Sequence, residues 1–171
     1  VGGCSNVKRH SEVIKALPRI IEDYPSVMYL HLGTGDTEEE EKELAAKLQV
    51  VDKIRFCKNQ SDVRKYLIAS DIYIMPSKYE GISITTIEAM ASGIPTILYN
   101  VPGLCDFNRY GENSLLIPED YEILAYSIIY LYSHPDVSAR ISKNAKEYVN
   151  NAYDMQSNVS KIVNLYSSLT V

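Results

Sequence analysis

Hydrophobic positions along the chain alternate between helical and extended spacing. In the stretch SEVIKALPRIIEDY (11–24), apolar residues recur every three or four positions, which predicts an amphipathic helix with Ser11 as its N-cap. The run VMYLHLG (27–33) is rich in β-forming residues and predicts a strand that ends at a glycine. A second helix is predicted over 37–50, because Thr37 can cap it and the glutamates that follow suit the positive end of the helix dipole.

The alternation of short strands and helices continues to the C-terminus. Further strands are predicted at 53–57, 71–76, 94–99 and 114–117, further helices at 61–70 and 84–92, and three closing helices at about 120–133, 136–151 and 154–169. Strands that alternate with helices of about ten residues are typical of βαβ units in a parallel sheet. The pattern therefore predicts an α/β fold: a doubly wound, Rossmann-like parallel sheet of about six strands flanked by helices, followed by C-terminal helices.

The composition is that of an ordinary globular domain, and a length of 171 residues favours one domain. A net charge of −5 and a pI near 5.2 argue against a nucleic-acid partner, which needs a concentrated basic face. No apolar run approaches the roughly 18 residues of a transmembrane segment, and no signal peptide is recognisable. Because the chain starts at Val1 rather than at Met, we expect it to be part of a longer protein.

Cysteine and histidine positions favour a reducing compartment and show no metal-site pattern. The three cysteines, Cys4, Cys57 and Cys105, are odd in number and far apart, which argues against a disulfide framework and favours the cytosol. The three histidines are equally scattered, and no Cys/His spacing is typical of a zinc site. We therefore expect no bound metal.

Ligands of doubly wound sheets bind beyond the carboxyl ends of the strands, where loops lead into helix N-termini. The first such loop, GGCSNVKRH, combines flexible glycines with Lys8 and Arg9, which suits a phosphate; a glycine turn with solvated basic residues is the alternative. The second, LGTGD, holds a Gly-x-Gly pattern, but Glu38 replaces the third glycine of a dinucleotide site. Gly33 and Gly35 are therefore expected to turn the chain or to pass close to a ligand.

The loop after the predicted strand DIYIM carries chemistry that suits a sugar nucleotide. It turns at Glu80 and Gly81, and a helix begins two or three residues later, so that the backbone N–H groups of 81–85 form an anion site. Glu88 lies one turn inside that helix, where its carboxylate can accept hydrogen bonds from a vicinal diol. Glu80 can reach hydroxyl groups on the far side of the anion. The alternative interpretation is that the two glutamates are solvent-exposed residues of one helix and bind no ligand.

The stretch PSKYEGISITTIEAMASGIPTI resembles the signature of the family 4 retaining glycosyltransferases of the GT-B fold, in which Glu-x7-Glu is followed by EAMA-G-P. Five further stretches are similar to motifs of that family in order and spacing: VGGCSNVKRH, LHLGTGD, DKIRFC, ASDIYIMPS and VPGLCDFNRYGENSLLIPED. The resemblance covers nearly all 171 residues. It implies that 1–171 is a single donor-binding domain, the C-terminal half of a GT-B fold and a fragment of a longer two-domain enzyme.

The resemblance also implies a role for each matching residue. Glu88 would hold the ribose hydroxyls, Glu80 the hydroxyls of the donor sugar, and Lys8 would stabilise the diphosphate leaving group. Backbone donors to the sugar and the diphosphate would come from Gly81, Ile82, Ser83 and Ile84. The family's arginine partner of the lysine falls at Gly3, and Arg9 is the candidate replacement. No metal and no cofactor are implied, since the donor substrate is a nucleotide-diphosphate sugar.

For the whole protein, the resemblance implies a retaining glycosyltransferase that transfers a hexosyl-type sugar in the synthesis of cell-surface polysaccharide or another glycan. Its partners would be the nucleotide sugar, an acceptor glycan or lipid-linked glycan, and the N-terminal domain missing from this chain, without which the fragment should be inactive. The segment 154–169 resembles the family helix that crosses back to that domain; plain core packing is the alternative. We expect a location in the cytoplasm, or a peripheral one at the inner face of the cytoplasmic membrane.

Two other classes of function stay open. One is another GT-B enzyme, such as a nucleotide-sugar epimerase, which would share the fold but not the Glu-x7-Glu spacing. The other is a non-catalytic nucleotide-binding module of flavodoxin-like shape. The glycine at position 3 favours this second class if its presence means that the lysine–arginine pair that binds the diphosphate, here called the diphosphate clamp, has been lost.

Overall fold

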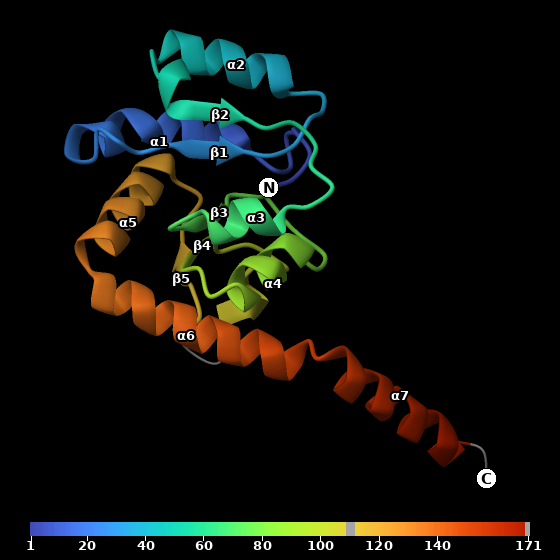
Figure 1. Ribbon diagram of the computed structural model, residues 1–171. Helices are drawn as coiled ribbons and strands as arrows, with labels where there is room; N and C mark the ends of the chain where they lie inside the picture. The colour runs from blue at the N-terminus through green and yellow to red at the C-terminus, as the bar shows by residue number, and fades with distance from the viewer. Residues whose placement is uncertain (109–111, 170–171) are drawn as a thin grey trace.

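The computed structural model describes residues 1–108 and 112–169, and Figure 1 shows how their helices and strands are arranged. The strands are β1 (Tyr29–His31), β2 (Ile54–Phe56), β3 (Tyr73–Met75), β4 (Thr96–Tyr99) and β5 (Leu115–Ile117). The helices are α1 (His10–Asp23), α2 (Glu38–Lys47), α3 (Arg64–Ile68), α4 (Ile84–Ala91), α5 (Tyr121–Ser133), α6 (Pro135–Ala152) and α7 (Met155–Leu169), with short 3-10 helices η1 (Val51–Lys53) and η2 (Cys105–Asn108). Every helix and strand predicted from the sequence has a counterpart here.

All strand pairs are parallel, which confirms the predicted α/β class. β1 pairs with β2, with Tyr29 opposite Ile54, and the other strands form a sheet in the order β3-β4-β5. Within the described residues there are thus five strands in two sheets, where the sequence predicts one sheet of about six. The pattern of the sequence defines the single strands but carries no information on where one sheet stops.

The three-stranded sheet is covered on both faces. All four residues of β4 have no exposed surface, as expected for a central parallel strand. Helix α4 contacts β3 and β4, and α5 contacts β4 and β5. Helix α1 packs along α5, and α6 packs along α4.

Helix α1 contributes to two hydrophobic cores. Val13 and Ile20 pack in the larger core, which surrounds the three-stranded sheet. Ile14 and Leu17 pack in a smaller core with residues of α2 and β2. The helix therefore lies between the two sheets and shares its apolar side chains between them.

One predicted helix cap is wrong and a second makes a different contact. Arg9, not Ser11, precedes the first turn of α1, and its backbone is left-handed with φ 53°. Ser11 lies inside the helix, because the chain enters α1 directly from that left-handed residue. Thr37 does precede α2, but its hydroxyl donates to Glu41 Oε1 at 2.8 Å instead of capping the backbone.

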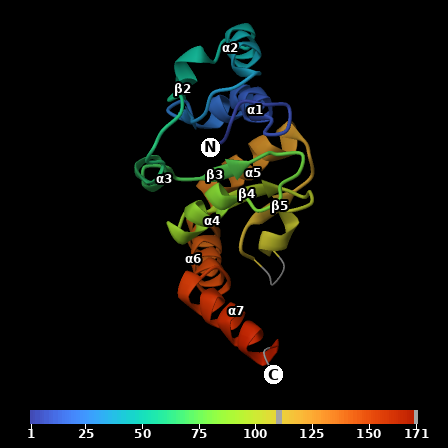
Figure 2. The ribbon, with the colours of Figure 1, turned by 90° about the vertical axis from the view of Figure 1, so that its right-hand side faces the viewer.

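The last helix projects from the rest of the structure. α7 points away from the sheets in both views (Figures 1 and 2) and buries none of its described residues. Its apolar side chains are exposed, among them Met155, Val159, Ile162 and Tyr166. Core packing is therefore not the role of this segment within the described residues. No helix in the described part of the chain has the length and apolar character needed to span a membrane.

Candidate functional site

The structure brings Lys8 and Glu80 together, although 72 positions separate them in the sequence. Lys8 Nζ lies 2.5 Å from Glu80 Oε1, and the hydroxyl of Ser77 donates to the same oxygen at 2.6 Å. The Glu80 side chain is 9% exposed and that of Lys8 27%, so the pair lies at the edge of the interior. Both hydrogen bonds that the described residues donate to this carboxylate reach Oε1, which leaves Oε2 able to accept from a ligand.

Main-chain hydrogen bonds hold this pair in place. The N–H of Lys78 donates to the carbonyl of Val7 at 2.9 Å, and the N–H of Glu80 donates to the carbonyl of Pro102 at 3.0 Å. Three loops therefore meet here: the loop before α1, the loop after β3 and the loop after β4. Gly103 in the third loop has φ +81°, and a Cβ at this position would lie 2.0 Å from the Glu80 carbonyl oxygen. Only glycine permits so close an approach of the two backbones.

The first turn of α4 begins in the same loop. Of the four predicted backbone donors, Ser83 is buried, and the others are exposed: Gly81, Ile82 and Ile84. The hydroxyl of Tyr73 in β3 lies 2.8 Å from Thr85 Oγ1, which ties the turn to the sheet. Burial raises the pKa of Tyr73 to about 12, so the phenol keeps its proton for this hydrogen bond. Because the first N–H groups of a helix have no partner inside it, this turn offers backbone donors to an anion.

Glu88 lies on the exposed side of α4. It lines a pocket of about 540 Å³ together with Ser61 and Asp62 of the loop before α3 and Lys146 of α6. A helix rises by about 1.5 Å per residue, so a ligand that touched both glutamates would extend along the first turns of α4. The two predicted acidic residues thus belong to one helix and its preceding loop, and Glu80 is not among the residues that line the pocket beside Glu88.

Arg9 is engaged by two carboxylates. Its guanidinium pairs with Glu119 and, at 3.3 Å, with Glu12. It also lies over the ring of Tyr99, 5.4 Å from the ring centroid. These neighbours neutralise the positive charge, which leaves Arg9 less able to bind a phosphate than the sequence suggests.

Gly3 takes the place of the family arginine, and its surroundings are open. Its φ lies outside the left-handed region, and a Cβ there would contact only the Thr34 carbonyl oxygen, at 3.5 Å. That distance is an ordinary van der Waals contact. The backbone at Gly3 therefore accepts a side chain.

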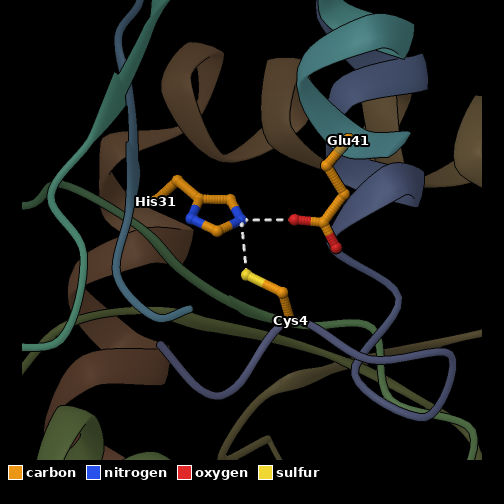
Figure 3. A group of neighbouring side chains, drawn as sticks. All are labelled: Cys4, His31 and Glu41. Carbon is orange, nitrogen blue, oxygen red and sulfur yellow. Dashed lines mark hydrogen bonds and ion pairs between the residues drawn. The ribbon is translucent and has the colours of Figure 1, made fainter. Parts of the chain in front are cut away.

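A buried polar cluster lies beside the first loop, and sequence reasoning missed it. His31 Nε2 lies 2.7 Å from Glu41 Oε2 and 3.8 Å from Cys4 Sγ (Figure 3). Burial alone raises the pKa of Glu41, but hydrogen bonds from His31 and Thr37 outweigh it and lower that pKa. Burial raises the pKa of the Cys4 thiol to about 12, so the sulfur stays protonated. No local signal could have found the cluster, because its members come from three separate elements.

The ligand atoms of Cys4, His31 and Glu41 all lie within 4.8 Å of one another, and two of the contacts between them are hydrogen bonds. His31 turns Nε2 toward both neighbours, while its buried Nδ1 has no partner among the described residues. An Nε2–H that donates to Glu41 leaves Nδ1 as an acceptor.

His10 packs against this cluster as a neutral imidazole. Its ring centroid lies 4.3 Å from that of His31. His10 Nε2 lies 3.1 Å from the Gly2 carbonyl oxygen, which can only accept, so Nε2 carries the proton. Nδ1 then accepts from the hydroxyl of Tyr29 at 2.8 Å. Burial lowers the pKa of His10 to about 3, which agrees with these two hydrogen bonds to the neutral ring.

Comparison with known proteins identifies the family. The family model described as "Glycosyl transferases group 1" matches residues 1–148, and this chain belongs to that family. An uncharacterized glycosyltransferase of Haemophilus influenzae is 29% identical over 148 residues, which are 85% of this chain and 42% of that protein. The lipopolysaccharide core biosynthesis glycosyltransferase LpsE of Rhizobium meliloti is 29% identical over 136 residues, 79% of this chain and 39% of that protein. The chain thus spans about two fifths of the length of these relatives.

A solved structure agrees with the fold. Anabaena Alr3699/HepE, crystallised in complex with UDP-glucose, superposes with a TM-score of 0.88 at 22% sequence identity. The match covers 98% of this chain and 47% of that chain. The prediction of one half of a GT-B glycosyltransferase fold is therefore confirmed.

Gly103→Ala should displace the loop that carries Glu80. The new Cβ would overlap the Glu80 carbonyl oxygen in addition to straining a left-handed backbone, which alone costs about 1–3 kcal/mol. Gly93→Ala is a matched control: Gly93 has φ +75°, but its Cβ would meet only Lys146 Cδ at 3.9 Å. Urea denaturation should show a larger loss of stability for Gly103→Ala. Equal losses would mean that the Gly103–Glu80 contact does not constrain the loop.

The neutral state of His10 should make the fold sensitive to acid. Between the ordinary pKa of 6.5 and about 3, the unfolded histidine binds a proton that the folded one does not. The free energy of unfolding should therefore fall by about 1.4 kcal/mol for each unit by which the pH decreases in this range. His10→Gln should remove that contribution, and His134→Gln, at an exposed position, should not. Urea denaturation at several pH values measures the slopes, and an unchanged slope in His10→Gln would contradict a buried neutral ring.

Proposed function

We propose that this chain is the donor-binding domain of a nucleotide-sugar-dependent retaining glycosyltransferase. The observation that carries the proposal is the Lys8–Glu80 pair, which lies beside the first turn of α4 at the carboxyl ends of the strands. Ligands bind at this edge in doubly wound folds. The Anabaena structure, which contains UDP-glucose, and the relative named for lipopolysaccharide core biosynthesis support a role in polysaccharide or other glycan synthesis.

The chemistry of sugar transfer matches the groups at this edge. The bond between the anomeric carbon and the diphosphate breaks while a bond to the oxygen of an acceptor hydroxyl forms on the same face of the sugar, and the hydroxyl proton passes to the departing diphosphate oxygen. Negative charge grows on the leaving diphosphate, and Lys8 with the backbone N–H groups at the start of α4 would stabilise it. Glu80 would hold sugar hydroxyls through Oε2, and Glu88 would hold the ribose diol. We assign no metal and no cofactor to this step.

The remaining parts of the proposal concern the whole protein. An N-terminal domain would bind the acceptor, a glycan or lipid-linked glycan, on the other side of a cleft. The exposed apolar side of α7 would cross to that domain. We place the protein in the cytoplasm or peripherally at the inner face of the cytoplasmic membrane.

One observation favours a second candidate, a non-catalytic nucleotide-binding module. The clamp on the diphosphate has a glycine at position 3, and Arg9 is already paired with Glu119 and Glu12. Because the backbone at Gly3 accepts a side chain, Gly3→Arg should tighten nucleoside-diphosphate binding if the clamp is merely weakened. Isothermal titration calorimetry would measure the gain.

Nucleoside diphosphates should bind to this edge and raise the unfolding temperature of the domain. Glu88→Ala should lower affinity about tenfold or more, since a hydrogen bond to a charged group contributes about 1.5–3 kcal/mol. Lys8→Ala should weaken diphosphate binding more than nucleoside binding, because only the diphosphate carries the anion. Binding should be measured for UDP, GDP and ADP and for the corresponding nucleosides, so that each candidate base is tested.

Lys47→Ala, at an exposed position at the end of α2, is the control and should bind as the parent does. Equal binding by the parent and Glu88→Ala would reject the ribose assignment. Equal losses for diphosphate and nucleoside in Lys8→Ala would reject the diphosphate assignment.

Residues 1–171 alone should not transfer sugar to an acceptor. Orientation of two reactants can contribute about 7–11 kcal/mol to lowering a barrier, and this chain offers no group that we assign to the acceptor. Labelled nucleotide sugars and pooled glycan acceptors, tested with this chain and with a longer protein that carries both domains, give the comparison. Comparable turnover by both would show that the two-domain mechanism is wrong.

A further inference from the structure

Arg9 fastens the loop before α1 to the ends of two strands. Its guanidinium forms an ion pair with Glu119, which follows β5, and lies over the ring of Tyr99, the last residue of β4. The Arg9 side chain is 17% exposed, so these neighbours cover most of it. This contact between side chains adds to the main-chain hydrogen bond that already joins the loop before α1 to the loop after β3.

Glu119 is itself held in place between β5 and α5. The N–H of Asp120 donates to the carbonyl of Pro118 at 2.8 Å, and the Asp120 carboxylate caps the first turn of α5. Helix α5 in turn packs along α1, whose first turn Arg9 precedes. The ion pair therefore joins the beginnings of two neighbouring helices, and on the α5 side a helix cap fixes the backbone.

Lys8 lies between two residues that are both held from outside their own loop. On one side, the carbonyl of Val7 accepts a hydrogen bond from the N–H of Lys78 at 2.9 Å. On the other side, Arg9 carries the ion pair just described. The ammonium of Lys8 therefore reaches Glu80 from a backbone that is held at both neighbouring residues.

The backbone of Arg9 does not favour its own conformation. With φ 53° and ψ 43° it lies in the left-handed region, which residues with a Cβ seldom adopt. Contacts of the side chain must offset that cost, and those of Arg9 are the ion pairs with Glu119 and Glu12 and the contact with Tyr99. Of the two ion pairs, the one with Glu119 reaches another part of the chain, whereas Glu12 belongs to α1 itself.

We propose that the Arg9–Glu119 ion pair is a positioning contact for diphosphate binding. It keeps the backbone of Lys8 in the place from which the ammonium reaches the diphosphate, and the Arg9 guanidinium stays with its carboxylates. This inference rests on the proposed function, since it concerns how the same site binds its anion. It has an unusual consequence: Glu119, an acidic residue, favours the binding of an anion because it holds the loop that carries the cation.

Neutralising Glu119 distinguishes this role from direct binding of phosphate by Arg9. If Arg9 bound the phosphate, Glu119→Gln would free its guanidinium and tighten the binding of a nucleoside diphosphate. The positioning role predicts the opposite result. Glu119→Gln and Arg9→Gln should each weaken diphosphate binding by about two- to fivefold, as expected for the loss of one partly exposed ion pair, and leave nucleoside binding unchanged. Isothermal titration calorimetry with UDP, GDP and ADP and with their nucleosides measures both.

Glu122→Gln is the matched control. It removes the same charge from the same end of α5, but Glu122 is exposed, and the carboxylates paired with Arg9 are those of Glu119 and Glu12. Removal of this charge should leave diphosphate binding unchanged or slightly tighter, because an acidic residue repels an anion. In the Arg9→Gln background, Glu119→Gln should cause no further loss, since the two residues act as one contact.

A measurement without nucleotide tests the position of the loop itself. In Glu119→Gln and Arg9→Gln, the Lys78 amide, which donates to Val7, should exchange its hydrogen about two- to fivefold faster than in the parent. The Glu80 amide donates to Pro102 and joins the other two loops, so its exchange should not change. Hydrogen exchange followed by NMR compares the two amides in one sample.

Tighter diphosphate binding by Glu119→Gln than by Glu122→Gln would overturn the proposal, and so would unchanged exchange at Lys78 in both variants. Equal losses for diphosphate and nucleoside would also overturn it, because they would indicate a general loss of structure. If the parent binds none of the diphosphates, the proposed function fails. Exchange at Lys78 then still decides the role of the ion pair: faster exchange supports a contact that holds the loop, and unchanged exchange rejects it.

Discussion

Main-chain hydrogen bonds between three loops fix the candidate site, and the position of each side chain in it depends on them. One loop leads into α1 and the other two follow β3 and β4, and they meet where Lys78 and Glu80 donate to carbonyl groups of the other two. Peptide groups make these bonds, so the arrangement does not depend on which side chains the loops carry. Gly103 adds the one requirement that is specific to a residue type, because it lets the third loop approach the Glu80 backbone. The backbone arrangement of the three loops can therefore stay constant while the side chains that face a ligand vary.

Glu41 and Glu80 are both hydrogen-bonded carboxylates, but they differ in which of their oxygens can still accept a hydrogen bond. Both oxygens of Glu41 are used, one by His31 and one by Thr37, and the residue is fully buried. Glu80 is nearly as buried, but its described partners share a single oxygen. A buried carboxylate with every acceptor occupied stabilises the fold, whereas one with an oxygen left over toward the surface can still exchange water for a ligand. Whether an oxygen stays free on a carboxylate therefore distinguishes a binding acid from a structural one better than the degree of burial of its side chain does.

Much of the fold could be predicted from the sequence, and less of the site. Amphipathic periodicity located the helices, because burial on one face leaves a regular pattern, and short runs of β-forming residues located the strands, including β4, which is buried throughout. The loops that carry Lys8 and Glu80 could be singled out by the general rule that ligands of doubly wound sheets bind beyond the carboxyl ends of the strands, but the direct contact between these two residues could not. The ion pair between Arg9 and Glu119 could not be predicted either: the two residues are 110 positions apart, and no periodic pattern marks a contact between two loops. The cluster of Cys4, His31 and Glu41 was missed for the same reason.

The division of α1 between two cores links the two parts of the domain. Successive apolar residues of this single helix, Val13 and Ile14, face different cores, as do Leu17 and Ile20. Neither core can lose its packing without freeing a helix that the other one needs. Unfolding should therefore be cooperative across both sheets, so that neither sheet forms an independent folding unit. Tightening either part, by a ligand or by a substitution, suppresses opening fluctuations in both.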